Sequence, residues 1–415
     1  MDYEDIITAL KNGTVPANGA SEICIGRENE INEFKYLLGK INEGKAYTKF
    51  IDGEYGAGKS FFLKVIEEIA FDENFVVARV TLSRDVPFNK IEIVYRNIVK
   101  NLRCKTGTSL EHIIERWIIK LKRMAFDETS DPVKQNSLIN ENIHNDLENA
   151  RKHSNPFVVA IENYNKAMNS EEYETAKYAQ AWLRGDSNIP YTEKRKFGVK
   201  GDVDRENAFK LLEALSAFLK SIGYSGLVIL IDEAEYIMML QSKKLRDTAY
   251  NYIRDIYDEC NQEKFQNTMF IFAGTPRFFD DPKIGVPSYE ALNDRIEDAL
   301  DTSLKDLRKP ILKLEGFTKD ELIEMAKKLV LMHENVYNWN GREKIEPVME
   351  NIVDVHEENA GLTGGRVTPR IFVRSFMSVL DTIQQNPNEF NEDKDILKVF
   401  EEKETELEEA LDDDW

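Results

Sequence analysis

Cysteine and histidine are both scarce in this chain, and their scarcity argues against several classes of protein. Three cysteines (Cys24, Cys104 and Cys260) stand far apart, so we expect neither a disulfide scaffold nor a zinc site. The five histidines form no close pairs, which argues against a metal cluster. No apolar stretch reaches transmembrane length, and we expect no secretory leader, no membrane contact and a cytoplasmic location.

Positive charge is also in deficit, with a formal net charge of −20 at pH 7. Half of the excess lies between Glu389 and Trp415, which hold 13 acidic and 3 basic residues. Such a block is typical of a solvated, mobile terminus, and an acidic surface does not favour sequence-independent DNA binding. Three roles for this tail stay open: a solubilising terminus, a docking segment for a basic partner, or a cover for the basic residues 366–374.

What the sequence does contain is a complete nucleotide-phosphate loop of the form G-x-x-x-x-G-K-S. Its glycines permit backbone angles that let consecutive N–H groups turn toward a phosphate. Lys59 supplies a positive charge to the β- and γ-phosphates, and Ser60 offers a hydroxyl ligand to Mg²⁺. The residues expected to bind the nucleoside triphosphate are Gly53, Glu54, Tyr55, Gly56, Ala57, Gly58, Lys59, Ser60 and Phe61.

The surroundings of the loop suit this interpretation better than a chance match. Residues 50–52 resemble the end of a buried strand, and residues 60–71 have helical periodicity. The phosphates would therefore meet the N-terminus of a helix, where unpaired N–H groups and the helix dipole attract an anion.

A second motif follows in residues 226–233, where a continuous apolar run ends in Asp232 and Glu233. An uninterrupted apolar run is typical of a central parallel strand, and ligands bind at the carboxyl end of such strands. We expect Asp232 to hold Mg²⁺, directly or through water, and Glu233 to polarise the attacking water. The alternative is that the two carboxylates only cap a helix over residues 234–240.

The remaining pattern predicts one α/β core with helical additions. Residues 105–200 have helical spacing and form an expected insertion, although residues 157–161 suit a short strand by composition. A capping box at Thr318 starts a helix at Lys319, and Thr368 and Pro369 form an N-cap and N1 pair. Strands are expected at 75–82, 269–273 and 311–314, and helices at 28–38, 88–102, 206–222 and from 292. The expected divisions are 1–310 for the core, 311–388 for a helical lid and 389–415 for the tail.

Three polar residues stand where a nucleotide site could use them. Thr275 follows the strand at 269–273 and would lie beside the end of the acidic strand. Arg295 lies shortly after it, at the start of a helix. Arg370 falls in the first turn of a helix, where the helix dipole disfavours a cation, so it indicates either a functional role or a surface ion pair.

The order of these features resembles the AAA+ ATPases, and the opening at residues 25–28 resembles their replication-initiator branch. Four stretches together resemble the BrxD family of ATP-binding proteins from BREX phage-defence systems: 53–63, 182–185, 274–296 and 368–376. The resemblance covers about residues 20–385 and leaves the tail unmatched.

The resemblance implies an AAA+-type parallel-sheet P-loop ATPase core with a helical lid, using ATP and Mg²⁺. It further implies a prokaryotic defence subunit that self-associates and acts beside a helicase-like partner, with DNA bound directly or through that partner. By the same resemblance Thr275 corresponds to the first sensor, Arg295 to the arginine finger and Arg370 to the second sensor. Four other arginines compete for the last two roles: Arg254, Arg277, Arg308 and Arg366.

Two functional classes stay open at this point. The first is an ATP-hydrolysing switch or motor, and the second is a nucleotide-holding regulatory module with little turnover. Glu233 favours the first, because a protein that only binds ATP has no use for a carboxylate that polarises water. A small-molecule kinase would also need an acceptor pocket, which the sequence does not indicate.

Overall fold

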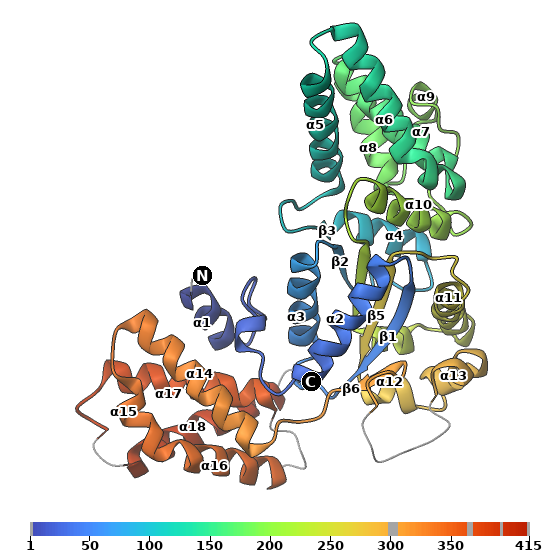
Figure 1. Ribbon diagram of the computed structural model, residues 1–415. Coiled ribbons are helices and arrows are strands. Elements are labelled where there is room, and N and C mark those ends of the chain that lie inside the picture. Colours follow the sequence, from blue (N-terminus) through green and yellow to red (C-terminus); the bar gives the residue numbers. More distant parts are fainter. Residues whose placement is uncertain (1–2, 298–305, 363–367, 391–392, 413–415) are drawn as a thin grey trace. The chain divides into compact units, whose positions relative to one another are not determined.

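The computed structural model describes residues 3–297, 306–362, 368–390 and 393–412 (Figure 1). The chain forms two compact units that interleave along the sequence. The first unit combines residues 1–32, 52–69 and 313–415, and the second combines residues 33–51 and 70–312. The phosphate loop therefore belongs to the same unit as the C-terminal helices, a grouping that the expected divisions at residues 310 and 388 did not anticipate.

A six-stranded sheet has the order β3-β2-β4-β5-β1-β6. Strand β4 pairs in parallel with both β2 and β5, while the short β3 pairs with β2 in antiparallel fashion. The mostly parallel sheet confirms the expected α/β class. The strands are β1 (Ala46–Asp52), β2 (Val76–Thr81), β3 (Leu102–Arg103), β4 (Leu227–Asp232), β5 (Thr268–Gly274) and β6 (Ile311–Lys313).

The central strands are buried on both faces, which explains their uninterrupted apolar sequences. Every residue of β4 and β5 is buried. The rings of Phe50 on β1 and Phe272 on β5 stack with centroids 5.5 Å apart, within one core cluster that extends into the helices of the second unit. This burial fixes the strand ends from which the candidate site residues emerge.

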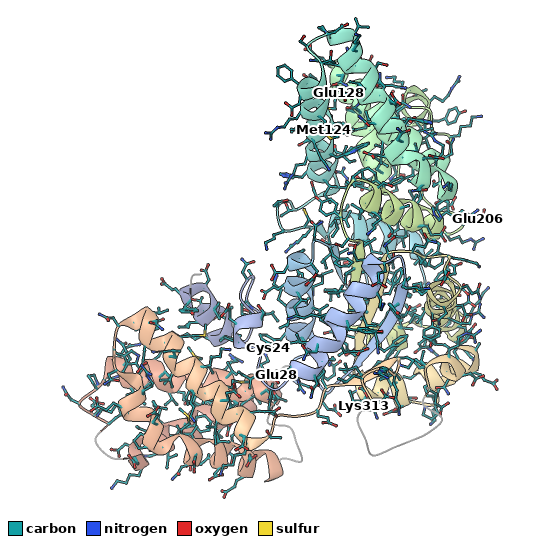
Figure 2. All side chains as sticks on the ribbon, viewed as in Figure 1. Cys24, Glu28, Met124, Glu128, Glu206 and Lys313 are labelled. Atoms are coloured by element: carbon teal, nitrogen blue, oxygen red, sulfur yellow. The ribbon has the colours of Figure 1, made fainter. Side chains whose placement is uncertain are left out.

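Helices make up most of the remaining described residues of the second unit (Figure 1). In the described residues from 110 to 200 the elements are all helices, and Figure 2 shows Met124 and Glu128 toward the end of one of them, α5. The α-helices are α4 (Ile91–Lys100), α5 (Leu110–Glu128), α6 (Pro132–His153), α7 (Asn155–Asn169), α8 (Tyr173–Leu183), α9 (Tyr191–Lys196), α10 (Ala208–Ser221), α11 (Lys243–Asn261), α12 (Pro276–Asp280) and α13 (Glu290–Ile296). Two 3-10 helices accompany them, η2 (Ala234–Met239) and η3 (Val286–Ser288).

Residues 157–161 belong to helix α7 and not to a strand. The Phe157 N–H donates to the side chain of Ser154, the N-cap residue, and Pro156 occupies the first turn. Phe157, Val158 and Ile161 are buried among other helices of the insertion. The N-cap serine and the proline that follows it therefore predict this segment correctly as a helix, whereas its β-branched composition does not.

The first unit is built mainly from helices that lie far apart in the sequence. The predicted capping box is present, because Thr318 and Glu321 bond reciprocally at the start of α14. The elements are α1 (Tyr3–Lys11), η1 (Ser21–Ile23), α14 (Lys319–Tyr337), α15 (Gly341–Ile345), η4 (Glu346–Val348), α16 (Met349–Leu362), α17 (Pro369–Gln385) and α18 (Asp393–Asp412). Helices α2 (Glu28–Asn42) and α3 (Lys59–Asp72) each pass from one unit into the other.

The acidic tail differs from the expected solvated segment, because it forms helix α18 and contributes to the core of the first unit. Ile396 and Phe400 are buried in the same cluster as Phe372 and Phe376 of α17. Glu404 is fully buried, 2.5 Å from Nδ1 of His356. The charge composition of the tail gave no sign of this burial, because the buried apolar residues are few and lie between acidic ones.

None of the helices in the described part of the chain combines the length and the apolar character that a membrane span requires.

Candidate functional site

The phosphate loop lies between β1 and α3, and its backbone has the conformation that its glycines were expected to supply. Gly56 and Gly58 have φ angles of 79° and 90°, a region that side chains disfavour. Helix α3 begins at Lys59 and runs for 14 residues, so its unpaired N–H groups follow the loop directly. A loop of this shape followed by a helix N-terminus suits an anionic phosphate group.

The Lys59 ammonium is held by the loop itself. Its Nζ donates to the carbonyl oxygens of Gly53, at 2.7 Å, and Glu54, at 3.1 Å. The same nitrogen lies 5.2 Å from the ring centroid of Tyr55, which is a cation–π distance. Lys59 is buried, and these contacts within the loop fix the position of its side chain.

The remaining loop residues divide between solvent and packing. Glu54 and Tyr55 are exposed, while Gly53 is buried. Ser60 is half-buried in the first turn of α3. Phe61 packs against the apolar cluster of the first unit, where Phe372 and Phe376 also lie.

Within the first unit, the N-terminus of α17 lies against the phosphate loop. A β-carbon built on Gly56 would lie 2.5 Å from Thr368 Oγ1. Thr368 occupies the N-cap position and Pro369 the N1 position as predicted, but the Thr368 side chain does not cap the helix. The sequence therefore predicted the start of the helix correctly. The Thr368 side chain, however, contacts the phosphate loop and does not accept a hydrogen bond from the helix N-terminus.

Arg370 is exposed in the first turn of α17 and lies beside Gly13. Among the described residues, no carboxylate is within ion-pairing distance of it, which disfavours the surface ion pair considered from the sequence. Arg374 follows one turn later, and burial, with a contribution from the Arg370 charge, lowers the pKa of Arg374. Arg366, an alternative for the second sensor, lies outside the described residues.

In the second unit, Asp232 ends β4 and both of its carboxylate oxygens have partners. Oδ2 accepts from Nη2 of Arg79 at 2.7 Å, and Oδ1 accepts from the backbone N–H of Glu233 at 3.1 Å. Asp232 is only 3% exposed. A buried carboxylate needs such partners, because desolvation without them is costly.

Glu233 has a left-handed backbone conformation, with φ 59° and ψ 44°. This conformation is uncommon for a residue other than glycine, and it is often found at functional sites. The Glu233 side chain does not cap the 3-10 helix η2 that follows. The alternative that this acidic pair serves only as a helix cap therefore lacks support.

Thr275 follows β5, the parallel neighbour of β4, and is buried. It stands at the N-cap position of α12, but its hydroxyl does not cap that helix. Because β4 and β5 are parallel and adjacent, Asp232 and Thr275 leave the sheet at the same edge. The expected placement of Thr275 beside the acidic strand is thus found.

Arg295 lies on α13 and is paired within its own chain. Its Nε donates to Oδ1 of Asp258 at 2.6 Å, and its Nη1 donates to the Ala291 carbonyl. The hydrogen bond with Asp258 raises the pKa of Arg295. The helix expected from residue 292 begins at Glu290, and its expected continuation past residue 297 lies outside the described residues.

The other arginines considered for the finger role differ in their exposure and in their ion pairs. Arg254 is paired with Asp255 at 2.6 Å. Arg277 has a side chain 70% exposed and only a 3.4 Å contact with Asp281. Arg308 is also exposed. The geometry of a single chain does not single out one of these arginines as a finger.

The oxygen donors of this chain suit Mg²⁺. Ser60 offers a hydroxyl and Asp232 a carboxylate, and Mg²⁺ prefers oxygen ligands and completes its shell with water and substrate phosphates. The described residues contain no group of three or more His, Cys, Asp or Glu side chains that could form a metal cage. Ser60 and Asp232 each supply an oxygen donor of the kind that Mg²⁺ takes alongside water and substrate phosphates.

Arg79 is the residue that the sequence analysis missed. It lies within β2, a strand of sequence VVARVT, next to the strand that carries Asp232. Arginine is rarely placed inside a buried strand unless it has a partner. That single charged residue near the end of an apolar strand is the signal that could have identified it.

Comparisons with known proteins give one family match. The family described as BREX system ATP-binding protein BrxC/D matches residues 1–397. No curated protein matches this chain. Among solved structures, the Orc1 protein of Aeropyrum pernix in complex with DNA is similar at 12% identity and a TM-score of 0.31, covering 87% of this chain and 66% of that one. A likeness this low does not establish a common fold.

Proposed function

Because the chain belongs to the family of BREX system ATP-binding proteins BrxC/D, we propose that it is an ATP-hydrolysing subunit of an anti-phage defence system. The family assignment supports ATP as the nucleotide. The observation that carries the proposal further is the formed phosphate loop, in which Gly56 and Gly58 have positive φ angles and the Lys59 ammonium is held by loop carbonyls.

We assign phosphate binding to the loop from Gly53 to Phe61. Backbone N–H groups of the loop and of the first turn of α3 would contact the phosphate oxygens. The Lys59 ammonium would exchange its two carbonyl partners for the β- and γ-phosphates. That exchange replaces neutral acceptors with charged ones, which form the stronger hydrogen bonds.

Hydrolysis is assigned to the acidic pair. Asp232 and Ser60 would hold Mg²⁺, which neutralises charge on the phosphates, and Glu233 would orient and polarise the attacking water. Thr275 would help to place that water from the neighbouring strand end. The left-handed backbone at Glu233 supports this assignment, because phosphoryl transfer depends mostly on positioning and electrostatics.

Two arginines complete the proposal. Arg370 is a candidate second sensor, supported by its position two residues after Thr368, whose side chain contacts Gly56 of the phosphate loop. Arg295 is a candidate arginine finger that a neighbouring subunit would receive. In that role it would have to leave Asp258, or use the part of its guanidinium that Asp258 does not occupy.

We further place the chain on the BrxD side of its family, on the four sequence stretches that resemble BrxD. On this proposal it is a cytoplasmic AAA+-like switch or motor that self-associates and works with a helicase-like defence partner on DNA. The regulatory alternative, a module that holds ATP and rarely hydrolyses it, is favoured by one observation: Asp232 and Arg295 are both already paired within the chain.

The decisive experiment measures ATP hydrolysis by the purified full chain, with and without DNA, alongside its mass in solution with ATP. The proposal expects Mg²⁺-dependent turnover that Lys59→Ala abolishes, and an increase in mass when ATP is added. ATP binding without turnover under every condition would support the regulatory module. Unchanged ATP affinity in a folded Lys59→Ala variant would refute the site itself.

A further inference from the structure

The ion pair between Arg79 and Asp232 places a positive charge directly beside the carboxylate assigned to Mg²⁺. Arg79 Nη2 and Asp232 Oδ2 are 2.7 Å apart, and the Arg79 side chain is 29% exposed against 4% for that of Asp232. The phosphate-loop chemistry assigned above makes no use of an arginine at this position.

The strand register explains how the two side chains meet. Strands β2 and β4 are parallel, and Arg79 pairs with Leu230 while Thr81 pairs with Asp232. Because side chains alternate between the two faces of a strand, Arg79, Thr81, Leu230 and Asp232 all lie on the same face. Arg79 is thus the diagonal neighbour of Asp232, at a distance that its long side chain can bridge.

The pair also extends to Glu233 through one more hydrogen bond. Arg79 fixes Oδ2 of Asp232, which leaves Oδ1 to accept the N–H of Glu233 at 3.1 Å. That N–H belongs to the residue with the left-handed backbone. A rotation of the Asp232 carboxylate would break this bond as well, so Arg79 supports the placement of both acidic residues.

We propose that Arg79 is a positioning residue of the ATPase site that holds Asp232 and sets how strongly the site binds a divalent metal. The inference rests on the proposed function, because it assumes that Asp232 serves the metal. Each Asp232 oxygen already accepts one hydrogen bond, and the adjacent Arg79 charge would weaken the attraction between the carboxylate and a cation.

The test separates the charge of Arg79 from its hydrogen bonds. Arg79→Gln keeps a donor and loses the charge, whereas Arg79→Lys keeps the charge and loses the planar guanidinium that fixes the geometry of the hydrogen bond. The readout is the Mg²⁺ concentration that half-restores binding of a fluorescent ATP analogue after chelation by EDTA. We expect this concentration to fall roughly tenfold in Arg79→Gln, the size expected for one unit charge several Å from the metal.

The expected result for Arg79→Lys is a half-saturating Mg²⁺ concentration close to that of the wild type, with slower ATP turnover at saturating Mg²⁺. Arg151→Gln is a matched control, because Arg151 is 30% exposed and paired with Glu162 at 2.7 Å on the helical insertion. This control should change neither quantity. If Arg79→Gln does not fold, Arg79→Met provides a neutral side chain of similar length for the same titration.

An unchanged Mg²⁺ dependence in both folded neutral variants would overturn the role of Arg79. Asp232→Asn distinguishes that result from failure of the proposed function. If Asp232→Asn weakens Mg²⁺ dependence while the Arg79 variants do not, the metal assignment stands and the Arg79 inference fails. If Asp232→Asn also binds the nucleotide with wild-type Mg²⁺ dependence, the metal assignment itself is wrong.

Discussion

Thr368 and Gly56 lie in contact although one begins a C-terminal helix and the other is part of the phosphate loop. A β-carbon built on Gly56 would lie within 2.8 Å of three atoms of the Thr368 side chain, Oγ1, Cβ and Cγ2. The contact leaves no room for a side chain at position 56, and it links the helix that carries Arg370 to the loop that is assigned to the phosphates.

We therefore predict that Gly56→Ala weakens both ATP binding and stability. The left-handed backbone alone costs about 1–2 kcal/mol for an alanine, and the contact with Thr368 adds to this cost. Gly58→Ala is the matched control, because Gly58 also has a positive φ but a β-carbon there meets no atom within 4 Å. Thermal unfolding should give a lower melting temperature for Gly56→Ala than for Gly58→Ala, and nucleotide titration should give a weaker ATP affinity. Partial recovery in Gly56→Ala combined with Thr368→Gly would assign the difference to the contact, and equal losses in the two single variants would contradict it.

Glu233→Gln should separate ATP binding from hydrolysis. The amide keeps the size of the side chain and removes the charge that polarises water, so turnover should fall by about 100-fold or more. ATP affinity should stay within a few-fold of the wild type. Glu206→Gln removes the same charge from an exposed position, labelled in Figure 2, and should have no effect. Wild-type turnover in Glu233→Gln would mean that another residue orients the water.

Arg295 can be tested as a finger separately from its structural role. Arg295→Ala removes both the ion pair with Asp258 and the proposed finger, whereas Asp258→Asn breaks the ion pair and retains the arginine. We expect Arg295→Ala to lose most ATPase activity and Asp258→Asn to retain it, because partly exposed ion pairs contribute only about 0–1 kcal/mol to stability.

Mixing two inactive variants extends this test to subunit contacts. Arg295→Ala supplies an intact nucleotide site, and Lys59→Ala supplies an intact arginine. Some turnover should return in the mixture if the arginine acts across a subunit boundary. Equal activity losses in Arg295→Ala and Asp258→Asn, or a monomer with full activity, would argue against a finger at this position.

The buried face of α18 leads to a prediction about stability. Phe400 is fully buried against α17, so Phe400→Ala should lower the free energy of unfolding by about 3–5 kcal/mol. Removal of residues 393–415 should be at least as damaging. Glu402→Gln, an exposed change on the same helix, is the control and should be neutral. Chemical denaturation gives the comparison, and an unchanged midpoint in Phe400→Ala would show that α18 is not part of the core in solution.

Much of the fold was predictable because its signals are local. The apolar run of β4, the glycine pattern of the loop and the capping box at Thr318 each depend on neighbours in the sequence, and the structure has all three. The segment at 157–161 was ambiguous because periodicity alone does not distinguish a short apolar run in a strand from one in a buried helix. The N-cap at Ser154 and the proline after it carried the information that resolved it.

What the sequence could not supply depends on residues that meet across long separations. The Arg79 pair with Asp232 needs the strand order, which no local pattern contains. Charge composition favoured a solvated tail. In the structure, however, Ile396 and Phe400 pack in one apolar cluster with residues of α17, and Glu404 pairs with His356. The roles of Thr275, Arg295 and Arg370 stay predictions, because they concern a bound nucleotide or a neighbouring subunit.

The interleaving of the two units has a consequence for how the protein is made. One apolar cluster joins residues that lie far apart in the sequence. It contains Ile6, Ile7 and Leu10 of α1, Phe372 and Phe376 of α17, and Phe400 of α18. During translation, α1 leaves the ribosome long before its packing partners exist, whereas the second unit is complete by residue 312. The second unit can therefore fold on the nascent chain, whereas the apolar cluster of the first unit forms only after residues 372–400 have been synthesised.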